Sequence, residues 1–275
     1  MTNAAPSAHL PRVAVERRGA VAHVVLSNGA RHNAIDWPML SELVSTARAL
    51  ASDRTLRAVI LRGEGASFCS GLDFPRFTKQ PGRIVQAFAK LSPGKTNLFQ
   101  EACWAWRRVP VPVIAVLHGR CYGGGLQVAL AADFRLSTPD CELSVLEAKW
   151  GLVPDMSGTV ALRELVGIDQ AKLLTYTGRV VSGQEALAIG LVTQVHNDPL
   201  AAAERLVEEL AARSPDAVAA AKDLLQQNWA DSEANGLARE RRLQMLVLAG
   251  RNFREALRAN FGERPPSFGK RSPLL

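Results

Sequence analysis

The 275-residue sequence lacks any apolar run long enough to cross a membrane. Its longest such runs are Val111–Leu117 and Leu126–Ala132, whereas a membrane-spanning helix needs about 20 apolar residues. The first eleven residues also lack a basic stretch followed by an apolar stretch, which is the pattern of a secretory signal. We therefore expect a protein of the cytoplasm with no membrane partner.

Cysteine is scarce, and its spacing is as informative as its number. The four cysteines, Cys69, Cys103, Cys121 and Cys141, include no CxxC pair. This pattern does not favour a zinc site or a disulfide framework. We expect four reduced, buried thiols and no bound metal.

Acidic residues are outnumbered by basic ones, which leaves a formal net charge of +7. A basic balance favours anionic partners. No interleaving of aromatic and basic residues and no RNA-binding motif accompanies the charge, so we do not expect nucleic acid as a partner. Two interpretations stay open: a phosphorylated ligand such as coenzyme A, or helix faces that are simply solvated.

Hydrophobic residues make up 47% of the chain, and they predict strands that alternate with helices. A helix is expected after Asp36, which is a good N-cap, and the segment Phe74–Pro93 is expected to be a mobile loop with at most a short helix. Alternation of this kind indicates an α/β fold. The other expected strands and helices are Val13–Arg17, Val21–Leu26, Ala58–Leu61, Val113–Leu117, Thr96–Trp106 and Gly124–Ala132.

From Asp198 onward the strand signals vanish, and only helical patterns follow. Asp198-Pro199 and Ser214-Pro215 each predict the start of a helix, and two further helices are expected over Ser232–Ala249 and Asn252–Phe261. About 75 residues are few for a stable core of their own. We therefore divide the chain into a core with the active site, residues 1–197, and a helical region for packing and oligomerisation, residues 198–275.

Two glycine-containing turns carry the strongest functional signal. They are Phe68-Cys69-Ser70-Gly71-Leu72-Asp73 and His118-Gly119-Arg120-Cys121-Tyr122-Gly123-Gly124-Gly125. The second is no Walker A loop because no Gly-Lys-Ser/Thr follows it, and Ser70 lacks the first glycine of a nucleophile elbow. Each turn is expected to free a backbone N–H. Two such donors that converge on one oxygen would form an oxyanion hole, worth roughly 3–4 kcal/mol per donor.

With the segments around them, these turns resemble the enoyl-CoA hydratase/isomerase (crotonase) superfamily. The resemblance extends over nearly the whole chain. It is carried by the two turns and by Val25–Asn28, Asn33-Ala34, Pro110–Ala115, Leu146-Glu147, Gly151–Pro154, Thr177–Arg179, Glu185-Ala186, Gly190–Val192 and Arg264-Pro265-Pro266-x-Phe268.

The resemblance implies a crotonase-like spiral of ββα units followed by a C-terminal helical trimerisation region. It also implies a homotrimer or a dimer of trimers that binds an acyl-CoA thioester. Coenzyme A then enters as part of the substrate, and no tightly bound cofactor is expected. On the matching positions, the backbone N–H groups of Ser70 and Gly124 hold the thioester oxygen. Asp73, Gly123 and a cation near the C-terminus, Lys270 or Arg264, are implied to bind substrate.

The polar residues behind the turns bear on which reaction occurs. Hydratases of the superfamily use two glutamates; Gln127 stands at the first position and Glu147 at the second. An amide neither accepts nor donates a proton usefully at neutral pH. Dienoyl-CoA isomerases carry acids at the positions of both Glu147 and Asp155. The resemblance therefore favours double-bond isomerisation of an enoyl- or dienoyl-CoA, with Glu147, Asp155 and Gln127 as catalytic candidates.

Several alternatives stay open at this point. Asp155 is also a candidate N-cap for a helix over Ser157–Leu165, and Gln127 could be structural. Trp150 is the best candidate among the tryptophans for a pocket wall, although such residues more often belong to a core or an interface. Glu147 alone could support water addition, and a catalytically silent scaffold protein is an alternative of another class.

Overall fold

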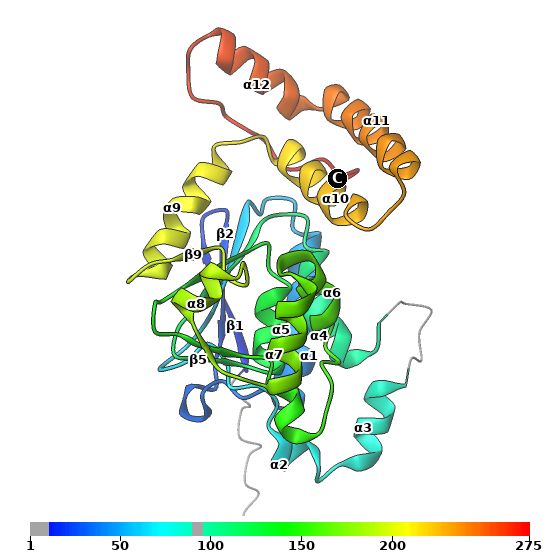
Figure 1. The fold of residues 1–275 in the computed structure, drawn as a ribbon. Helices are drawn as coiled ribbons and strands as arrows, with labels where there is room; N and C mark the ends of the chain where they lie inside the picture. Colours follow the sequence, from blue (N-terminus) through cyan, green and yellow to red (C-terminus); the bar gives the residue numbers. More distant parts are fainter. Residues whose placement is uncertain (1–10, 90–95) are drawn as a thin grey trace, which may run out of the picture.

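In the computed structural model, which describes residues 11–89 and 96–275, the larger sheet has six strands in the order β1-β2-β3-β4-β6-β9 (Figure 1). β1 and β2 pair antiparallel, and every other neighbouring pair in this sheet is parallel. The predicted strands within it are confirmed. Its strands are β1 (Val13–Arg18), β2 (Val21–Leu26), β3 (Ala58–Gly63), β4 (Val113–Leu117), β6 (Phe134–Ser137) and β9 (Gln194–Val195).

A smaller sheet lies beside it and contains β5 (Arg120–Tyr122), β7 (Glu142–Ser144) and β8 (Val181–Ser182). Along the chain, a strand of the larger sheet is followed by a strand of the smaller sheet and then by a helical segment. This order occurs first as β4-β5-α5 and then as β6-β7-η2. This repetition confirms the expected spiral of ββα units. The second glycine-containing turn follows β4 directly, and β5 lies within it.

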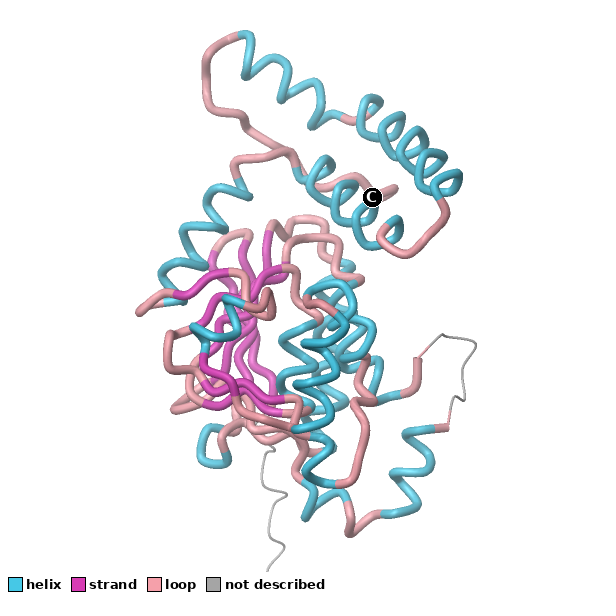
Figure 2. The backbone as a smooth tube through the Cα atoms, in the orientation of Figure 1, coloured by secondary structure: helices cyan, strands magenta, loops and turns pink. Residues whose placement is uncertain are grey.

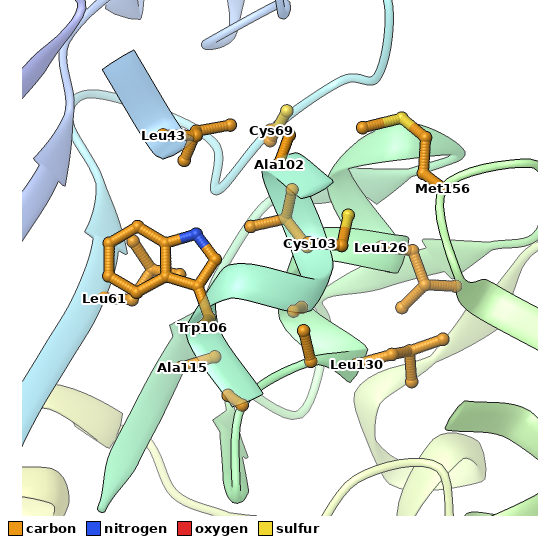
Figure 3. Close-up of a cluster of buried hydrophobic side chains, with 14 of the residues drawn as sticks. Leu43, Leu61, Cys69, Ala102, Cys103, Trp106, Ala115, Leu126, Leu130 and Met156 are labelled. Atoms are coloured by element: carbon orange, nitrogen blue, oxygen red, sulfur yellow. The ribbon is translucent and has the colours of Figure 1, made fainter. Parts of the chain in front are cut away.

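Helices α1 (Trp37–Ser52), α4 (Leu98–Arg107) and α5 (Gly124–Leu130) cover one face of the larger sheet (Figures 1 and 2). Asp36 caps α1 as predicted, because its side chain accepts from the Met39 N–H at 3.1 Å. Trp106 of α4 is fully buried in this core, beside Leu61 of β3 (Figure 3). The four cysteines are free and buried, as expected.

The opposite face of the sheet is covered by α9 (Pro199–Ala211). A second core joins Ala202, Ala203 and Val207 of this helix to alternate residues of the strands, including Ile60 and Ile114. Alternation along a strand places successive side chains on opposite faces. The boundary predicted at residues 197 and 198 therefore falls at the start of a helix that packs on the sheet.

Helices α10 (Pro215–Asn228), α11 (Glu233–Ala249) and α12 (Arg251–Phe261) extend beyond the sheets (Figure 1). Lys222 anchors α10 to the core by donating to Asp133 at 2.7 Å and to the Val111 carbonyl at 3.0 Å. These helices leave several large apolar side chains exposed: Leu225, Trp229, Leu237, Met245, Leu257 and Phe261.

The remaining segments surround the smaller sheet and the turns. They are η1 (Gly29–Arg31), α2 (Phe74–Phe77), α3 (Pro81–Phe88), η2 (Glu147–Trp150), α6 (Gly158–Leu165), α7 (Ile168–Thr177) and α8 (Gly183–Ala188). The expected loop over residues 74–93 was therefore wrong over most of its length; residues 90–95 lie outside the described part. Pro75 and Pro81 stand in the first turns of α2 and α3, where a missing N–H costs nothing. In the described ranges, no helix has both the length and the apolar character that a bilayer span requires.

Candidate active site

The two glycine turns lie side by side because backbone hydrogen bonds join them. The N–H of Phe68 donates to the His118 carbonyl and that of Cys69 to the Arg120 carbonyl, both at 2.9 Å. The Tyr122 N–H returns a bond to the Cys69 carbonyl at 3.0 Å. These three bonds bring segments about fifty residues apart in the sequence to one place.

Gly71 is needed where the turns meet. Its φ is +95°, which side chains rarely tolerate, and an added Cβ would lie 3.0 Å from the Tyr122 carbonyl oxygen and 3.7 Å from the Gly124 nitrogen. Glycine allows this close approach without strain.

The two amides expected to form an oxyanion hole differ in their present partners. Gly124 begins α5, and its N–H has no acceptor among the residues of the described ranges. The Ser70 N–H, in contrast, donates to the His32 carbonyl at 2.9 Å. His32 has a left-handed backbone with φ of 51°, directly after η1. The expectation that the Ser70 N–H is free is thus corrected, whereas the Leu72 N–H of the same turn has no acceptor among the described residues. Ser70 can serve a ligand only by sharing or leaving the His32 carbonyl.

A small cavity of about 110 Å³ lies at these turns. Both turns contribute to its wall, and so do both candidate acids. It is lined by Ser70, Gly71, Leu72, Phe74, Gly123, Gly124, Leu146, Glu147, Trp150, Leu152 and Asp155.

Glu147 follows β7 at the start of η2, and only 7% of its surface is exposed. Its Oε1 accepts from Nε2 of Gln127 at 2.6 Å, whereas its buried Oε2 has no partner among the described residues. Gly123 lies close to this carboxylate, since an added Cβ there would be 3.5 Å from Oε1. Burial raises the pKa of Glu147 above its ordinary value, and the nearby Asp155 adds to the rise.

Gln127 lies in α5 and is fully engaged. Its Oε1 accepts from the backbone N–H groups of Met156 and Gly158, both at 2.9 Å, while its Nε2 donates to Glu147. Gln127 therefore makes structural contacts, which was one of the two interpretations of its sequence position. One of these contacts is with the candidate base, Glu147.

Asp155 lines the same cavity, and burial raises the pKa of its carboxyl. It does not cap α6. The N-cap position is Ser157, with φ of 68°, and no side chain makes a capping hydrogen bond there. The helix-cap interpretation of Asp155 is therefore wrong.

Two aromatic rings stand at the mouth of the cavity. Trp150 of η2 and Phe74 of α2 pack with ring centroids 5.2 Å apart, and 57% of the Trp150 surface is exposed. Both line the cavity, so the structure places Trp150 where a pocket wall was expected. Trp37 and Trp106, in contrast, lie in the core.

Asp73 does not reach the cavity. It is buried and forms ion pairs with Arg31 at 3.0 Å and Arg76 at 3.3 Å. It is the N-cap residue of α2, but its side chain makes no capping hydrogen bond. Its assignment to substrate binding is therefore corrected to a structural role at the base of the turn.

Lys270 and Arg264 belong to the tail that follows α12, and neither lines the cavity. Helix α12 lies at the end of the molecule opposite to α2, whose Phe74 lines the cavity (Figure 1). Lys270 lines a separate cavity of about 930 Å³ between α10, α12 and the C-terminal tail. Arg264 is paired with Glu255 at 2.7 Å. Within one chain, neither cation contributes to the site.

Sequence reasoning missed Phe74, the His32 carbonyl and the Met156 and Gly158 amides. Phe74 carried a usable signal, because it directly follows the first turn and is apolar. The other three act through backbone atoms, for which side-chain identity gives no signal. Within the described ranges, no group of His, Cys, Asp or Glu has an arrangement that could hold a metal ion.

Comparisons with known proteins identify the family of this chain. The family model for enoyl-CoA hydratase/isomerase matches residues 16–271. A mitochondrial methylglutaconyl-CoA hydratase of Mus musculus is 31% identical over 260 residues, covering 92% of this chain and 80% of the relative. A mitochondrial Delta(3,5)-Delta(2,4)-dienoyl-CoA isomerase of Dictyostelium discoideum is 27% identical and covers 97% and 96% of the two chains.

Among solved structures, an enoyl-CoA hydratase from Bacillus anthracis superposes with a TM-score of 0.85 at 27% identity, covering 94% of this chain and 98% of that one. The fold and the site thus define a crotonase-type protein. The chain belongs to the enoyl-CoA hydratase/isomerase family.

Proposed function

We propose that this enzyme isomerises a double bond of an enoyl- or dienoyl-CoA thioester, with Glu147 as the base and Asp155 as the partner acid. The observation that carries the proposal is that the buried carboxyl group of Glu147 and the partly buried one of Asp155 line one small cavity beside the free Gly124 N–H. Similarity to a dienoyl-CoA isomerase over nearly the full chain supports it.

In the proposed first step, Oε2 of Glu147 takes a proton from the carbon next to the thioester carbonyl. The electrons of that C–H bond move into the carbonyl and generate an enolate. The Gly124 N–H, at the positive end of α5, stabilises the new negative charge on oxygen. Ser70 joins it if its N–H turns from the His32 carbonyl to the substrate.

In the second step, the enolate electrons return to form the new double bond. The original double bond takes up a proton at its far carbon, and Asp155 is the group that we propose to supply it. The raised pKa of Asp155 favours its protonated form, which suits a proton donor, and that of Glu147 brings the base nearer to neutral pH. Because the substrate and product are isomers, the reaction needs no redox cofactor, and coenzyme A enters only as part of the substrate.

The direct test is turnover of 3-enoyl-CoA and 3,5-dienoyl-CoA, followed by the absorbance of the conjugated product. Calorimetric titration with a saturated acyl-CoA provides the control for binding. We expect both binding and conjugation. Binding of the thioester without conversion of either substrate would contradict the proposed reaction.

Hydration is the second candidate, because the methylglutaconyl-CoA hydratase is similar over most of its length. It would use Glu147 alone to activate water, since Gln127 cannot accept a proton. Formation of 3-hydroxyacyl-CoA from a 2-enoyl-CoA, faster than isomerisation of the 3-enoyl isomer, would select hydration.

We further propose that the protein acts in the cytoplasm as a homotrimer or a dimer of trimers. The exposed apolar side chains of α10, α11 and α12 support association, because their burial against another copy of the chain would be favourable. Light scattering coupled to size-exclusion chromatography tests the oligomer; a monomer at micromolar concentration would contradict it.

A further inference from the structure

We propose that Gln127 is a positioning residue: its side-chain amide ties Glu147 to the segment that carries Asp155 and leaves Oε2 of Glu147 as the one oxygen available for proton transfer. The catalytic meaning of this inference rests on the proposed function. The linkage itself is a property of the folded protein and is testable without turnover.

The geometry uses both ends of one amide. The carbonyl oxygen of Gln127 accepts from the N–H groups of Met156 and Gly158, each at 2.9 Å. Met156 directly follows Asp155 in the chain. The amino group of Gln127 donates to Oε1 of Glu147 at 2.6 Å. One side chain therefore holds both acid-bearing segments.

Close packing leaves this amide little freedom. Gln127 is buried, and an added Cβ on Gly158 would lie 2.6 Å from its Oε1. Met156 fills the space next to Gly124, where an added Cβ would meet its Sδ at 2.9 Å. The linkage is thus closely packed against other atoms of the site.

An amide satisfies both contacts of position 127 because these contacts have opposite polarity. A glutamate at position 127 could accept from the Met156 and Gly158 amides, but it could donate to Glu147 only when protonated. Two carboxylates 2.6 Å apart cannot both ionise readily, so they would share a proton. A methionine has a similar length but could satisfy neither contact.

The predicted change in pH dependence follows from the groups that face Glu147. Besides Gln127, these are Asp155 in the same cavity and the buried Cys103 thiol of α4, whose own pKa is raised by burial and by both acids. Neither supplies positive charge. As the base, Glu147 must lose its proton, so activity should rise with pH through its pKa. A second carboxyl at position 127 raises that pKa and moves this limb to higher pH.

The experiment compares Gln127→Glu and Gln127→Met with Gln227→Glu, which introduces the same charge on the exposed side of α10. We expect kcat at neutral pH to fall about 10²-fold in both Gln127 variants while acyl-CoA affinity changes little. In Gln127→Glu alone, the acidic limb of kcat/KM should shift upward by about one pH unit or more. Gln227→Glu should match the unmodified enzyme.

A second readout separates this inference from the proposed reaction. Carbon-13 NMR of glutamate-labelled protein, with Glu147→Gln to assign the resonance, follows the ionisation of Glu147 without substrate. We expect Gln127→Glu to move that titration to higher pH even if no turnover is found. An unchanged Glu147 titration would overturn the linkage, whereas a shifted titration in an inactive protein would overturn only the reaction.

Gly158→Ala keeps the inference testable if the Gln127 variants do not fold. The added methyl would press on Oε1 of Gln127 from 2.6 Å and loosen the same linkage without changing any polar group. We expect a smaller fall in kcat in the same direction. Wild-type kcat and an unchanged Glu147 titration in this folded variant would contradict the proposed role of Gln127.

Discussion

Two neighbouring regions of this molecule hold buried or partly buried carboxyl groups in opposite ways. At the base of the first turn, Asp36 and Asp73 are bound by arginines: Arg12 and Arg76 contact Asp36, and Arg31 and Arg76 contact Asp73, at 2.7–3.3 Å. In the cavity, no residue of the described ranges forms an ion pair with the two acids.

The contrast shows what separates a structural acid from a reactive one. A buried carboxylate that is paired with a cation gains little from protonation. A buried carboxyl without a cation has a raised pKa and can exchange its proton with a ligand. Sequence motifs contain both kinds, and only their partners distinguish them.

The largest expected effect comes from removing the proton acceptor in the cavity. Glu147→Gln keeps the shape of the side chain but cannot accept a proton, so kcat should fall about 10³-fold, within the range of general-base catalysis. Steady-state kinetics with 3-enoyl-CoA measure the loss. Retention of more than a tenth of the activity would remove Glu147 from the mechanism.

A smaller loss is expected for the partner acid. Asp155→Asn should lower kcat about 10²-fold and remove the alkaline limb of the kcat profile, because a donor must keep its proton. The raised pKa of Asp155 places that limb above the range of an ordinary aspartate. A profile that keeps its alkaline limb in the variant would assign the donor elsewhere.

Asp73, which is ion-paired, should affect the stability of the protein more than its activity. Asp73→Asn should leave kcat within about threefold but lower the free energy of unfolding by about 1–2 kcal/mol, because Arg31 and Arg76 are half-exposed and regain solvent. Urea denaturation checks the stability. A large loss of kcat in a stable Asp73→Asn protein would erase the distinction between the two regions.

The carboxyl group of Glu147 should also reduce the free energy of unfolding at neutral pH. The pKa of Glu147 is raised in the folded state. Its contribution to the free energy of unfolding is therefore most favourable below the pKa of the unfolded state, and it is lost as pH rises through the pKa of the folded state. Glu147→Gln should therefore stabilise the protein at neutral pH by about 1 kcal/mol, an advantage that shrinks in acid. Urea midpoints at several pH values provide the measurement; a pH-independent difference would contradict it.

The smallest effect is expected at the mouth of the cavity. Trp150→Ala removes the ring that packs on Phe74 and should change kcat/KM by about tenfold or less. The change should favour longer acyl chains, since the mouth would widen. An identical ratio of long-chain to short-chain activity in the variant would exclude Trp150 as a determinant of chain length.

Local signals in the sequence predicted much of the fold. β1 and β2 followed from short segments with β-branched residues, and α1 followed from the cap at Asp36, because both depend on neighbours a few residues away. The two turns and the acids at 147 and 155 were also placed correctly in one cavity.

The features of the site that the sequence did not predict depend on contacts between distant segments. The His32 carbonyl occupies the Ser70 N–H, and arginines at positions 31 and 76 neutralise Asp73. No local pattern at Ser70 or Asp73 indicates either partner. The sequence showed only that Gln127 replaces a glutamate and cannot accept a proton. Its contacts could not be predicted, because they are made with backbone amides about thirty residues away.

A crystal structure with a bound, unreactive acyl-CoA analogue tests the central claim most directly. It should place the carbon next to the thioester carbonyl about 3–3.5 Å from Oε2 of Glu147, with the carbonyl oxygen on the Gly124 N–H. A thioester bound with its oxygen away from Gly124, or with Glu147 turned out of the cavity, would contradict the account.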